Sequence, residues 1–346
     1  IVLGNADKLE IANLIKRKLL NPGQPWRKSA STEIIMSDIH KRRIFRTIPV
    51  RNFQGMTKAF IKVQTGCDEK CSFCTVVKAR GKSVSDTREN IIYNIQQAVT
   101  SGFKEITLTG INLGTWGMDR NETFSSLVRD IVELPGDFRV RLSSINPMEI
   151  DSDLIRLIAE TEKLCSHLHI PLQRGDDAIL KAMRRNYNRS QYLEVVQRAI
   201  TAIPGLGLGA DVIVGFPGET EEGFENTRKL IEQLPFSYLH VFSYSPRRGT
   251  EAYQLKDDVP GNLKKQRNQN LTQLANHKAF KLRENFLRQQ EIVLIENQRD
   301  KKSGWLKGHT GNYIPVIVEG SDSLKNHLVP VILQGVCEHQ VTGCVQ

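Results

Sequence analysis

The chain lacks the features that mark membrane and secreted proteins. None of its apolar runs approaches the length of about 20 residues that a membrane-spanning helix needs, and no signal peptide is visible at its amino end. Cysteine is scarce, with 6 in 346 residues, which excludes a small scaffold held together by disulfides. These absences predict a protein of the reducing cytoplasm without a membrane partner.

Three of the six cysteines stand close together, as Cys67, Cys71 and Cys74 in a C-x3-C-x2-C arrangement. Cubane iron–sulfur clusters are normally held by four thiolates, so three tightly spaced thiolates leave one iron open to a substrate or cofactor. We therefore interpret the three cysteines as ligands of an open [4Fe–4S] cluster. A zinc site completed by the distant Cys165 or His169 is one alternative. Disulfides are another, although cysteines this close in sequence pair poorly.

Around this spacing, ordered motifs resemble the radical S-adenosylmethionine (SAM) methylthiotransferase family over nearly the whole chain. The stretch at 59–67 is similar to the strand that enters the cluster loop in that family. The other matching blocks are Ala-Arg-Gly at 79–81, Leu-Thr-Gly-Ile-Asn-Leu-Gly at 108–114, Arg-Leu-Ser-Ser at 141–144, His-Leu-His-Ile-Pro-Leu-Gln at 167–173, Met-Arg-Arg-Asn-Tyr at 183–187 and Asp-Val-Ile-Val-Gly-Phe-Pro-Gly-Glu-Thr at 211–220. One departure is Arg174, which stands where the family usually has a serine.

The resemblance also favours one branch of the family. The blocks at 108–114 and 239–250 resemble the branch that modifies N6-threonylcarbamoyladenosine in tRNA. The isopentenyladenosine branch usually carries a Gly-Gln-Asn-Val type of sequence in the first block, and the ribosomal-protein branch a Gln-Asp type. Methylthiolation of isopentenyladenosine tRNA or of a ribosomal-protein side chain is therefore the alternative activity. A non-catalytic RNA-binding iron–sulfur protein is the alternative from another class, and the intact cysteine set argues against it.

The family resemblance implies a reaction that starts at a [4Fe–4S] cluster on Cys67, Cys71 and Cys74. One electron, from a donor such as flavodoxin or ferredoxin, cleaves SAM to methionine and a 5′-deoxyadenosyl radical. This radical attacks carbon 2 of an adenine, which polar reagents do not readily reach. A second SAM methylates sulfide on an auxiliary [4Fe–4S] cluster. The target adenosine lies beside the anticodon, in a single-stranded loop whose bases can be presented to a pocket.

By the same resemblance, seven further residues are expected to contact SAM. They are Gly110 and Asn112 for the methionine amino group, Gln173 and Arg185 for the ribose and carboxylate, and Gly215, Pro217 and Gly218 for the adenine side. Taken without the resemblance, Gly-Phe-Pro-Gly is only a turn, and the Arg184–Arg185 pair is equally a solvated helix face. His167 and His169 alternate with apolar residues, so we expect both inside a barrel with hydrogen-bonded rings.

Alternating strand and helix patterns from 56 to 288 predict an α/β domain, an incomplete (β/α)6 radical SAM barrel. The expected strands are 60–64, 105–109, 139–143, 167–170, 210–215 and 238–244, with helices such as 87–100, 124–134 and 222–234 between them. Six parallel strands fall short of the eight of a complete barrel. Because parallel barrels carry their chemistry at the carboxyl ends of the strands, the cysteine loop and the glycine motifs are expected at one edge.

The last third of the chain predicts a different architecture. A long basic helix at 256–290 is followed by short expected strands at 292–296, 304–310, 313–318, 328–333 and 335–341. This pattern suggests a small antiparallel β-barrel at 289–346, which resembles the RNA-binding TRAM domain. The net charge of +10 suits tRNA, with its anticodon loop as the partner. Expected RNA contacts are Lys301, Lys302, Trp305, Lys307, His309 and Tyr313, and the alternative for each is a solvated basic face.

The first 55 residues are expected to be peripheral. Residues 1–5 are typical of a buried strand and turn, and 8–20 of an amphipathic helix. Together, residues 1–20 look like the remnant of the family's amino-terminal domain, and 21–55 like a linker. That domain normally supplies three cysteines for the auxiliary cluster, and no cysteine precedes Cys67. We expect a fragment of a longer protein, with loss of the domain as the alternative, and expect it to cleave SAM without inserting sulfur.

Overall fold

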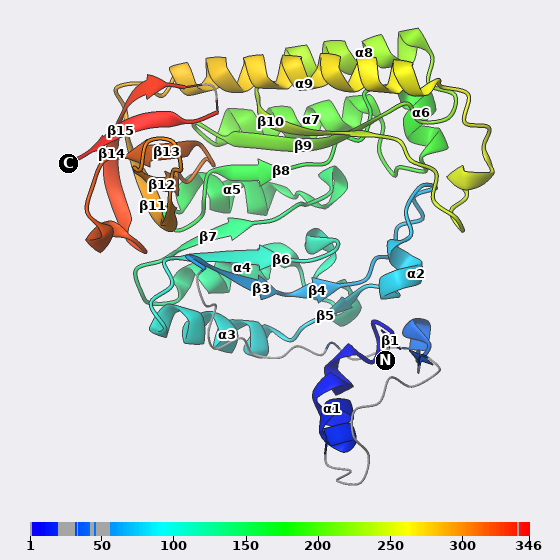
Figure 1. Cartoon of the computed structure of the whole chain (residues 1–346), viewed down its shortest axis with the longest axis horizontal. Coiled ribbons are helices and arrows are strands. Elements are labelled where there is room, and N and C mark those ends of the chain that lie inside the picture. The colour runs from blue at the N-terminus through cyan, green and yellow to red at the C-terminus, as the bar shows by residue number, and fades with distance from the viewer. Residues whose placement is uncertain (1, 20–31, 33, 42–44, 46–55, 338) are drawn as a thin grey trace.

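Six parallel strands form an open barrel in the computed structural model, which describes residues 2–19, 32, 34–41, 45, 56–337 and 339–346 (Figure 1). They pair in the orders β3-β6-β7 and β8-β9-β10, and a parallel bridge between Val140 and Leu164 joins the two halves. In the described part of the chain, the outer strands β3 and β10 do not pair with each other. The bounds are β3 (Lys58–Lys62), β6 (Glu105–Thr109), β7 (Arg139–Leu142), β8 (His167–His169), β9 (Gly207–Val214) and β10 (Phe236–Ser243). The predicted incomplete barrel is confirmed.

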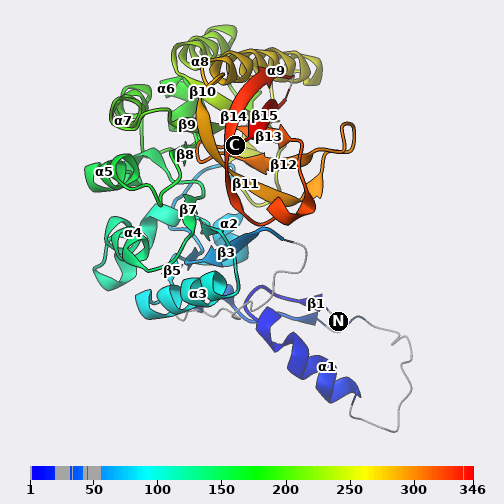
Figure 2. The same cartoon turned by 90° about the vertical axis from the view of Figure 1, so that its left-hand side faces the viewer.

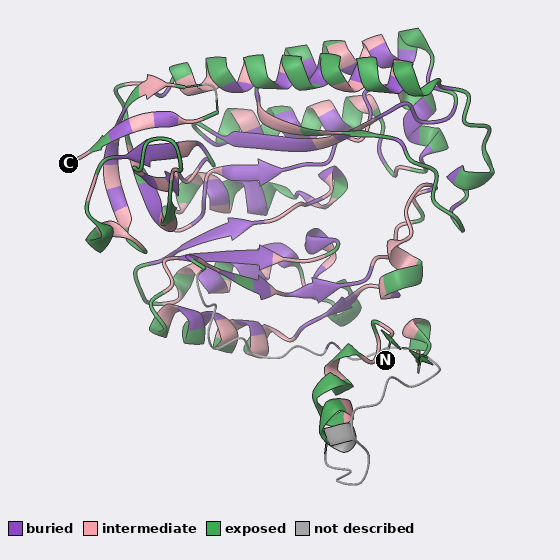
Figure 3. Ribbon diagram, viewed as in Figure 1, coloured by how far each residue is buried: buried purple, intermediate pink, exposed green. Residues whose placement is uncertain are grey.

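Helices cover the outer face of these strands, in an arc that Figure 2 shows end-on. Their apolar sides pack on the sheet, as Leu127, Val128 and Ile131 of α4 do, and the central strands are buried along most of their length (Figure 3). Side-chain caps define the starts of α3 to α8, because each capping oxygen accepts a hydrogen bond from a free amide of the first turn. The bounds are α3 (Arg88–Thr100), α4 (Phe124–Glu133), α5 (Ser152–Glu160), α6 (Asp177–Ala182), α7 (Arg189–Ala202), α8 (Glu221–Gln233) and α9 (Gly261–Glu284).

The long basic helix is shorter than predicted. Helix α9 begins only after Pro260 and ends at Glu284, because a proline fits the start of a helix but not its interior. Among the described helices, none is long and apolar enough to cross a bilayer. Short elements complete the core: β4 (Gln64–Thr65) pairs with β5 (Val84–Ser85), and α2 (Val76–Arg80) lies between them in sequence. The single-turn helices of the core are η3 (Leu113–Thr115), η4 (Met118–Arg120), η5 (Pro147–Glu149) and η6 (Ala252–Gln254).

A closed five-stranded barrel follows α9, in the order β11-β12-β13-β15-β14. Its strands are β11 (Gln290–Arg299), β12 (Leu306–His309), β13 (Pro315–Val318), β14 (Leu328–Val336) and β15 (Val341–Val345), with η7 (Asp322–Leu324) before β14. Two details differ from the prediction. The expected strand 335–341 is wrong, because Gly335 and Val336 extend β14 and the last strand starts only at Val341. The barrel is also not wholly antiparallel, since β13 and β15 pair in parallel to close it.

The amino-terminal residues form a small unit of their own. Strand β1 (Val2–Leu3) pairs in parallel with β2 (Ile34–Ile35), and the single turn η1 (Lys8–Glu10) leads into α1 (Ile11–Leu19), while η2 (Ile39–Lys41) follows β2. The expected burial of the first strand is wrong, because Val2 is 49% exposed. Most of the predicted linker at 21–55 lies outside the described residues.

A buried ion-pair network joins the two barrels. Glu105, at the start of β6, is fully buried. Its Oε2 accepts a hydrogen bond from Arg139 Nε at 2.7 Å, and its Oε1 accepts one from Arg141 Nε at 3.0 Å. The remaining N–H groups of the two arginines donate to backbone carbonyls of the C-terminal barrel, at Ile292, His309, Thr310 and Gly311. Burial alone would raise the pKa of Glu105, but Arg141 and Arg139 outweigh burial and lower it.

Close backbone packing accompanies these ion pairs. Gly207, at the start of β9, lies against the carbonyl of Asn312, and a Cβ there would come within 2.0 Å of that oxygen. The C-terminal barrel therefore docks on the amino-terminal edge of the six strands, at the end opposite to the cysteine loop (Figure 1).

We expect Glu105→Gln to lower the free energy of unfolding by about 3–5 kcal/mol, because it leaves two buried guanidinium groups without their counter-charge. Equilibrium denaturation with urea measures this. The control is Asp137→Asn, which removes an exposed partner of Lys104 and should cost about 1 kcal/mol or less. Since the pKa of Glu105 is lowered on folding, the stabilisation is present above its unfolded pKa and is lost as pH falls through its folded pKa. Equal losses in the two variants at neutral pH would contradict this account.

Candidate functional site

The cysteine loop leaves the sheet at the carboxyl end of β3 and β4 and is held in place by its backbone. The amide of Cys67 donates to the carbonyl of Gly81 at 3.1 Å. Gly66 has φ +79°, and a Cβ there would come within 1.9 Å of the carbonyl oxygen of Lys82, so only glycine fits. At the far side of the loop, the amide and hydroxyl of Ser72 donate to the carbonyls of Met183 and Ala182, after α6. The loop is thereby tied to two separate parts of the barrel rim.

The three cysteine side chains are half-buried within this loop. Burial raises the pKa of the Cys67 thiol to about 11, and the nearby Cys71 and Cys74 add to the rise. Burial also raises the pKa of Cys71, while Arg185 opposes it by donating to the Cys71 sulfur at 3.1 Å. Metal ligation removes such thiol protons. Three neighbouring thiols, one of them already facing a cation, fit an iron–sulfur cluster whose net charge is negative.

The alternative zinc ligands lie elsewhere. Cys165 is buried next to Arg141 at the opposite edge of the barrel, and His169 bonds Asp211 and Tyr238. Among the described residues, three metal-binding side chains have donor atoms within 4.8 Å of one another only at His169, Asp211 and His240. The cysteine sulfurs do not converge that closely, which disfavours a single-ion zinc site.

A polar network connects the cysteine loop to the predicted SAM residues. Arg185 contacts the Cys71 sulfur with one N–H and donates with another to Asn146 Oδ1 at 2.7 Å. Asn146 Nδ2 donates to Asn112 Oδ1 at 2.9 Å, and Asn112 Nδ2 donates to Glu149 Oε1 at 2.7 Å. Burial raises the pKa of Glu149, and its Oε2 has no hydrogen-bond partner in the described part of the chain. The structure thus brings Arg185 and Asn112 together, with a buried acceptor open to a ligand.

Two residues that complete this network were not predicted from the sequence. Asn146 lies in the loop after β7 and Glu149 in η5, at the same carboxyl edge as the cysteine loop, and that placement was a usable signal. Arg184 and Arg185 do not together form a solvated helix face. Arg184 is exposed and pairs with Glu251, whereas Arg185 is half-buried in the network.

Gln64 links the turn after β6 to the cysteine loop. Its side-chain oxygen accepts from the amides of Ile111 and Asn112, each at 3.0 Å, beside Gly110. Its side-chain nitrogen donates to the carbonyl of Gly66 at 2.9 Å. Gln64 is fully buried, so the two loops cannot separate without leaving its amide group unpaired.

The remaining predicted SAM residues lie in two different places. Gln173 faces a cavity of about 370 Å³ that Cys74 and Asp211 also line, and its buried side-chain oxygen has no partner in the described chain. The amides of Gly215 and Gly218 are already bonded to Glu219 and Asp258. Pro217 lies in the same turn, on the α9 side of the barrel. An adenine-binding role for this turn therefore stays a prediction.

The departure at Arg174 has a structural reason. Arg174 is fully buried and pairs with Glu219 at 2.8 Å, and Arg267 of α9 reaches the same carboxylate at 3.2 Å. An unpaired guanidinium would not be tolerated there. Arg174 therefore stabilises the turn after β9 and does not enter the cavity beside Cys74.

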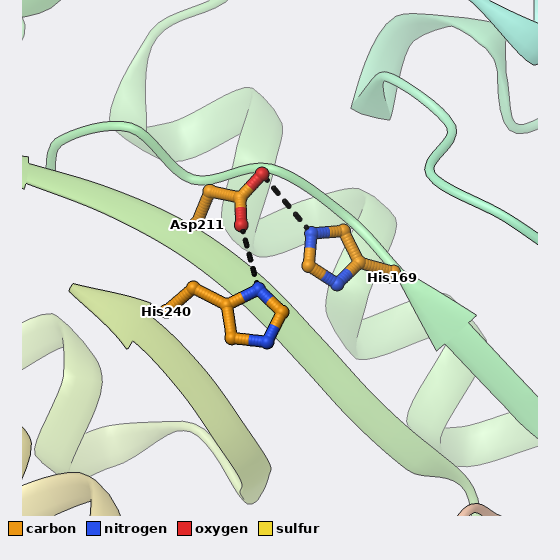
Figure 4. Close-up of side chains that lie close together, drawn as sticks. All are labelled: His169, Asp211 and His240. Atoms are coloured by element: carbon orange, nitrogen blue, oxygen red, sulfur yellow. Dashed lines mark hydrogen bonds and ion pairs between the residues drawn. The ribbon is translucent and has the colours of Figure 1, made fainter. Parts of the chain in front are cut away.

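Further into the barrel, three side chains from adjacent strands form the His–Asp–His group, His169, Asp211 and His240. His169 Nε2 lies 3.2 Å from one Asp211 oxygen and His240 Nδ1 lies 3.1 Å from the other (Figure 4). The hydroxyl of Tyr238 shares hydrogen bonds with both His167, at 2.9 Å, and His169, at 3.1 Å. The predicted interior, hydrogen-bonded histidines are confirmed.

The expected RNA contacts of the C-terminal barrel divide into two groups. Tyr313 is 36% exposed, although its ring centroid lies 5.0 Å from that of His167 and 4.9 Å from that of His309, and His309 pairs with Glu296. The other four lie on or near the turn between β11 and β12, where Lys301 and Lys302 are exposed and Trp305 and Lys307 are half-buried. Among the six expected contacts, the exposed lysines are those of this turn.

Comparison with known proteins agrees with this geometry. The radical SAM superfamily matches residues 61–231. The chain is 38% identical over 296 residues to tRNA-2-methylthio-N(6)-dimethylallyladenosine synthase of Protochlamydia amoebophila (strain UWE25), covering 85% of this chain and 66% of that protein. It is 41% identical over 270 residues to threonylcarbamoyladenosine tRNA methylthiotransferase MtaB of Rickettsia prowazekii (strain Madrid E), covering 77% and 62%.

MtaB of Bacillus subtilis (strain 168) is 34% identical over 335 residues, covering 96% of this chain and 72% of that protein. The chain thus spans 62% to 72% of the length of these three relatives. Membership of the radical SAM superfamily implies SAM and a [4Fe–4S] cluster, for which the three cysteines are fitting ligands. On its sequence, its open barrel and its cysteine loop, the chain belongs to the methylthiotransferase family within the radical SAM superfamily.

Proposed function

We propose that the chain is the catalytic and RNA-binding part of a cytoplasmic tRNA methylthiotransferase that modifies carbon 2 of N6-threonylcarbamoyladenosine beside the anticodon. The observation that carries this proposal is the cysteine loop joined through Arg185 and Asn146 to Asn112, at the carboxyl edge of an open barrel. A second barrel docked on the other edge, with the exposed Lys301 and Lys302 on one of its turns, supports RNA as the substrate. An electron donor such as flavodoxin or ferredoxin is the expected redox partner.

Cys67, Cys71 and Cys74 would hold the cluster, which supplies one-electron cleavage of the SAM sulfonium when it is bound. The chain's own residues do the positioning. Asn112 orients Glu149 beside the loop by donating to its Oε1, and Glu149 Oε2 offers a buried acceptor to an ammonium group. Gln173 offers another acceptor on the side of Cys74.

Sulfur insertion requires more than these groups. The family resemblance implies an auxiliary cluster, whose ligands are not among the cysteines of this chain, since none precedes Cys67 and the other three lie apart from it. We therefore propose that the chain alone carries the SAM-cleaving half of the reaction.

Reductive SAM cleavage is expected to depend on the loop cysteines. Cys71→Ala, reconstituted anaerobically with iron and sulfide, should form 5′-deoxyadenosine at least about a hundredfold more slowly. The reason is that an open cluster iron, at which SAM would be cleaved, needs all three thiolates. Chromatography of the nucleoside product after reduction with dithionite measures this. Cys344→Ala is the matched control, because that thiol is exposed in the C-terminal barrel. Cleavage that survives in Cys71→Ala would contradict the enzymatic assignment.

The substrate is tested in cells. Transfer RNA from a strain lacking the gene should lose the 2-methylthio group from threonylcarbamoyladenosine and keep it on isopentenyladenosine derivatives, as mass spectrometry of digested nucleosides would show. Loss from the isopentenyladenosine derivatives instead would assign the chain to the dimethylallyl substrate. An unchanged profile would reject tRNA as the substrate.

The turn between β11 and β12 is expected to contact phosphates. Replacing both Lys301 and Lys302 by Gln should make the slope of log K for tRNA against log salt shallower by about 1.4 to 1.8, because each lost phosphate contact removes about 0.7 to 0.9. The matched control replaces Lys181 and Lys229, exposed lysines of α6 and α8, and should leave the slope unchanged. Binding titrations at several salt concentrations measure the slope. Equal slopes for the parent chain and the two double variants would show that the RNA does not contact this turn.

A further inference from the structure

Two cavities adjoin the His–Asp–His group, one beside β10, α9 and the C-terminal barrel and the other beside the cysteine loop. One, of about 240 Å³, is lined by His240 and Tyr238 and by His309 and Tyr313 of the C-terminal barrel. The other, of about 370 Å³, is lined by Asp211 and reaches Cys74. A ligand that extends from the cavity beside Cys74 toward the C-terminal barrel would pass this group.

The group is held in position but still has hydrogen-bonding capacity. His169 is fixed from both sides, by Asp211 and by Tyr238. His240 is more exposed, with 57% of its side chain accessible, and its Nε2 has no partner among the described residues. Although burial raises the pKa of Asp211, hydrogen bonds from His169 and His240 lower it overall, so the carboxylate is ionised at neutral pH and has lone pairs left for further donors.

The geometry of an adenine base suggests what occupies this position. In adenine, carbon 2 and the N6 group stand on either side of N1. A base that presents carbon 2 toward the cysteine loop therefore directs its N6 substituent to a position away from that loop. The two substituents named for the relatives differ sharply in polarity. Dimethylallyl is a branched hydrocarbon, whereas threonylcarbamoyl carries ureido N–H groups, a hydroxyl and a carboxylate.

We propose that the His–Asp–His group binds the polar N6 substituent of the target adenosine, with Asp211 and the free Nε2 of His240 accepting from its N–H and O–H groups. This inference rests on the proposed function. A hydrocarbon at the same place would cover an ionised carboxylate and an imidazole without pairing them. Leaving these polar groups buried and unpaired would make the binding free energy less favourable, and for this reason sites built for polar groups discriminate strongly against apolar analogues.

The test compares the affinity of the chain, loaded with its iron–sulfur cluster, for three anticodon stem-loop RNAs. They are identical except that the target base is adenosine, threonylcarbamoyladenosine or dimethylallyladenosine, and anisotropy of a fluorescent label measures affinity. The parent chain should bind the threonylcarbamoyl RNA more tightly than the dimethylallyl RNA. Asp211→Asn and His240→Phe should each reduce that ratio by about tenfold, the effect of one lost buried hydrogen bond, without changing affinity for unmodified adenosine.

His277→Phe is the matched control, since His277 is an exposed histidine of α9 and its replacement should leave the ratio unchanged. Thermal unfolding of each variant shows whether it is folded, and Asp211→Asn, which keeps the side-chain shape, covers the case in which His240→Phe does not fold. If the parent prefers the threonylcarbamoyl RNA and both variants keep the preference, the inference is wrong and the proposed function stands. If the parent prefers the dimethylallyl RNA, or neither, the proposed substrate fails.

A divalent ion is the competing occupant, because the three donor atoms lie within 4.8 Å of one another and two histidines with one carboxylate are a common metal-binding set. The same titrations are repeated with EDTA and with added Mn²⁺. Unchanged preference in EDTA supports direct recognition. A preference that EDTA abolishes and Mn²⁺ restores would overturn it in favour of binding through a metal.

Discussion

The buried carboxylate of Glu105 determines how the two barrels meet. Two arginines share it, and their outward N–H groups are satisfied by carbonyls of the C-terminal barrel. An arginine placed at a strand start without either partner would carry a large desolvation cost, so the sheet edge and the second barrel stabilise each other. Arg141 also lies over the ring of Tyr313, which in turn packs on His167. The docking contact therefore continues directly into the barrel interior.

At the opposite edge of the strands, one neutral side chain joins two separate loops. Gln64 bonds the turn after β6 with its oxygen and the cysteine loop with its nitrogen. Arg185 and Asn146 extend the connection around the rim. Because each of these groups is at least half-buried, the cost of an unpaired amide or guanidinium holds the loop against the strands. Sites held in this way, by a shell of bonded neighbours on regular elements, keep their geometry better than sites on free loops.

The sequence was sufficient for the six strands, the cysteine loop and the closed C-terminal barrel, because each depends on local patterns: buried apolar runs, C-x3-C-x2-C spacing, and short strands between turns. It was insufficient where a residue's role depends on distant partners. Gln64, Asn146 and Glu149 are ordinary polar residues in the chain and gain their roles only through contacts across the rim. Arg174 departs from the family pattern, and only the buried Glu219 explains it. The last strand was misplaced because Gly335 is accommodated by an irregularity within β14.

The arrangement separates two tasks that a single reaction must combine. In the proposed reaction, chemistry at carbon 2 would depend on groups at the rim, where Cys71, Arg185, Asn146 and Asn112 form one connected set. Groups in the interior, such as Asp211 and His240, share no hydrogen bond with that set in the described part of the chain and line other cavities. Because the bonds that hold the cysteine loop do not involve Asp211 or His240, the polarity of the interior can change without disturbing that loop.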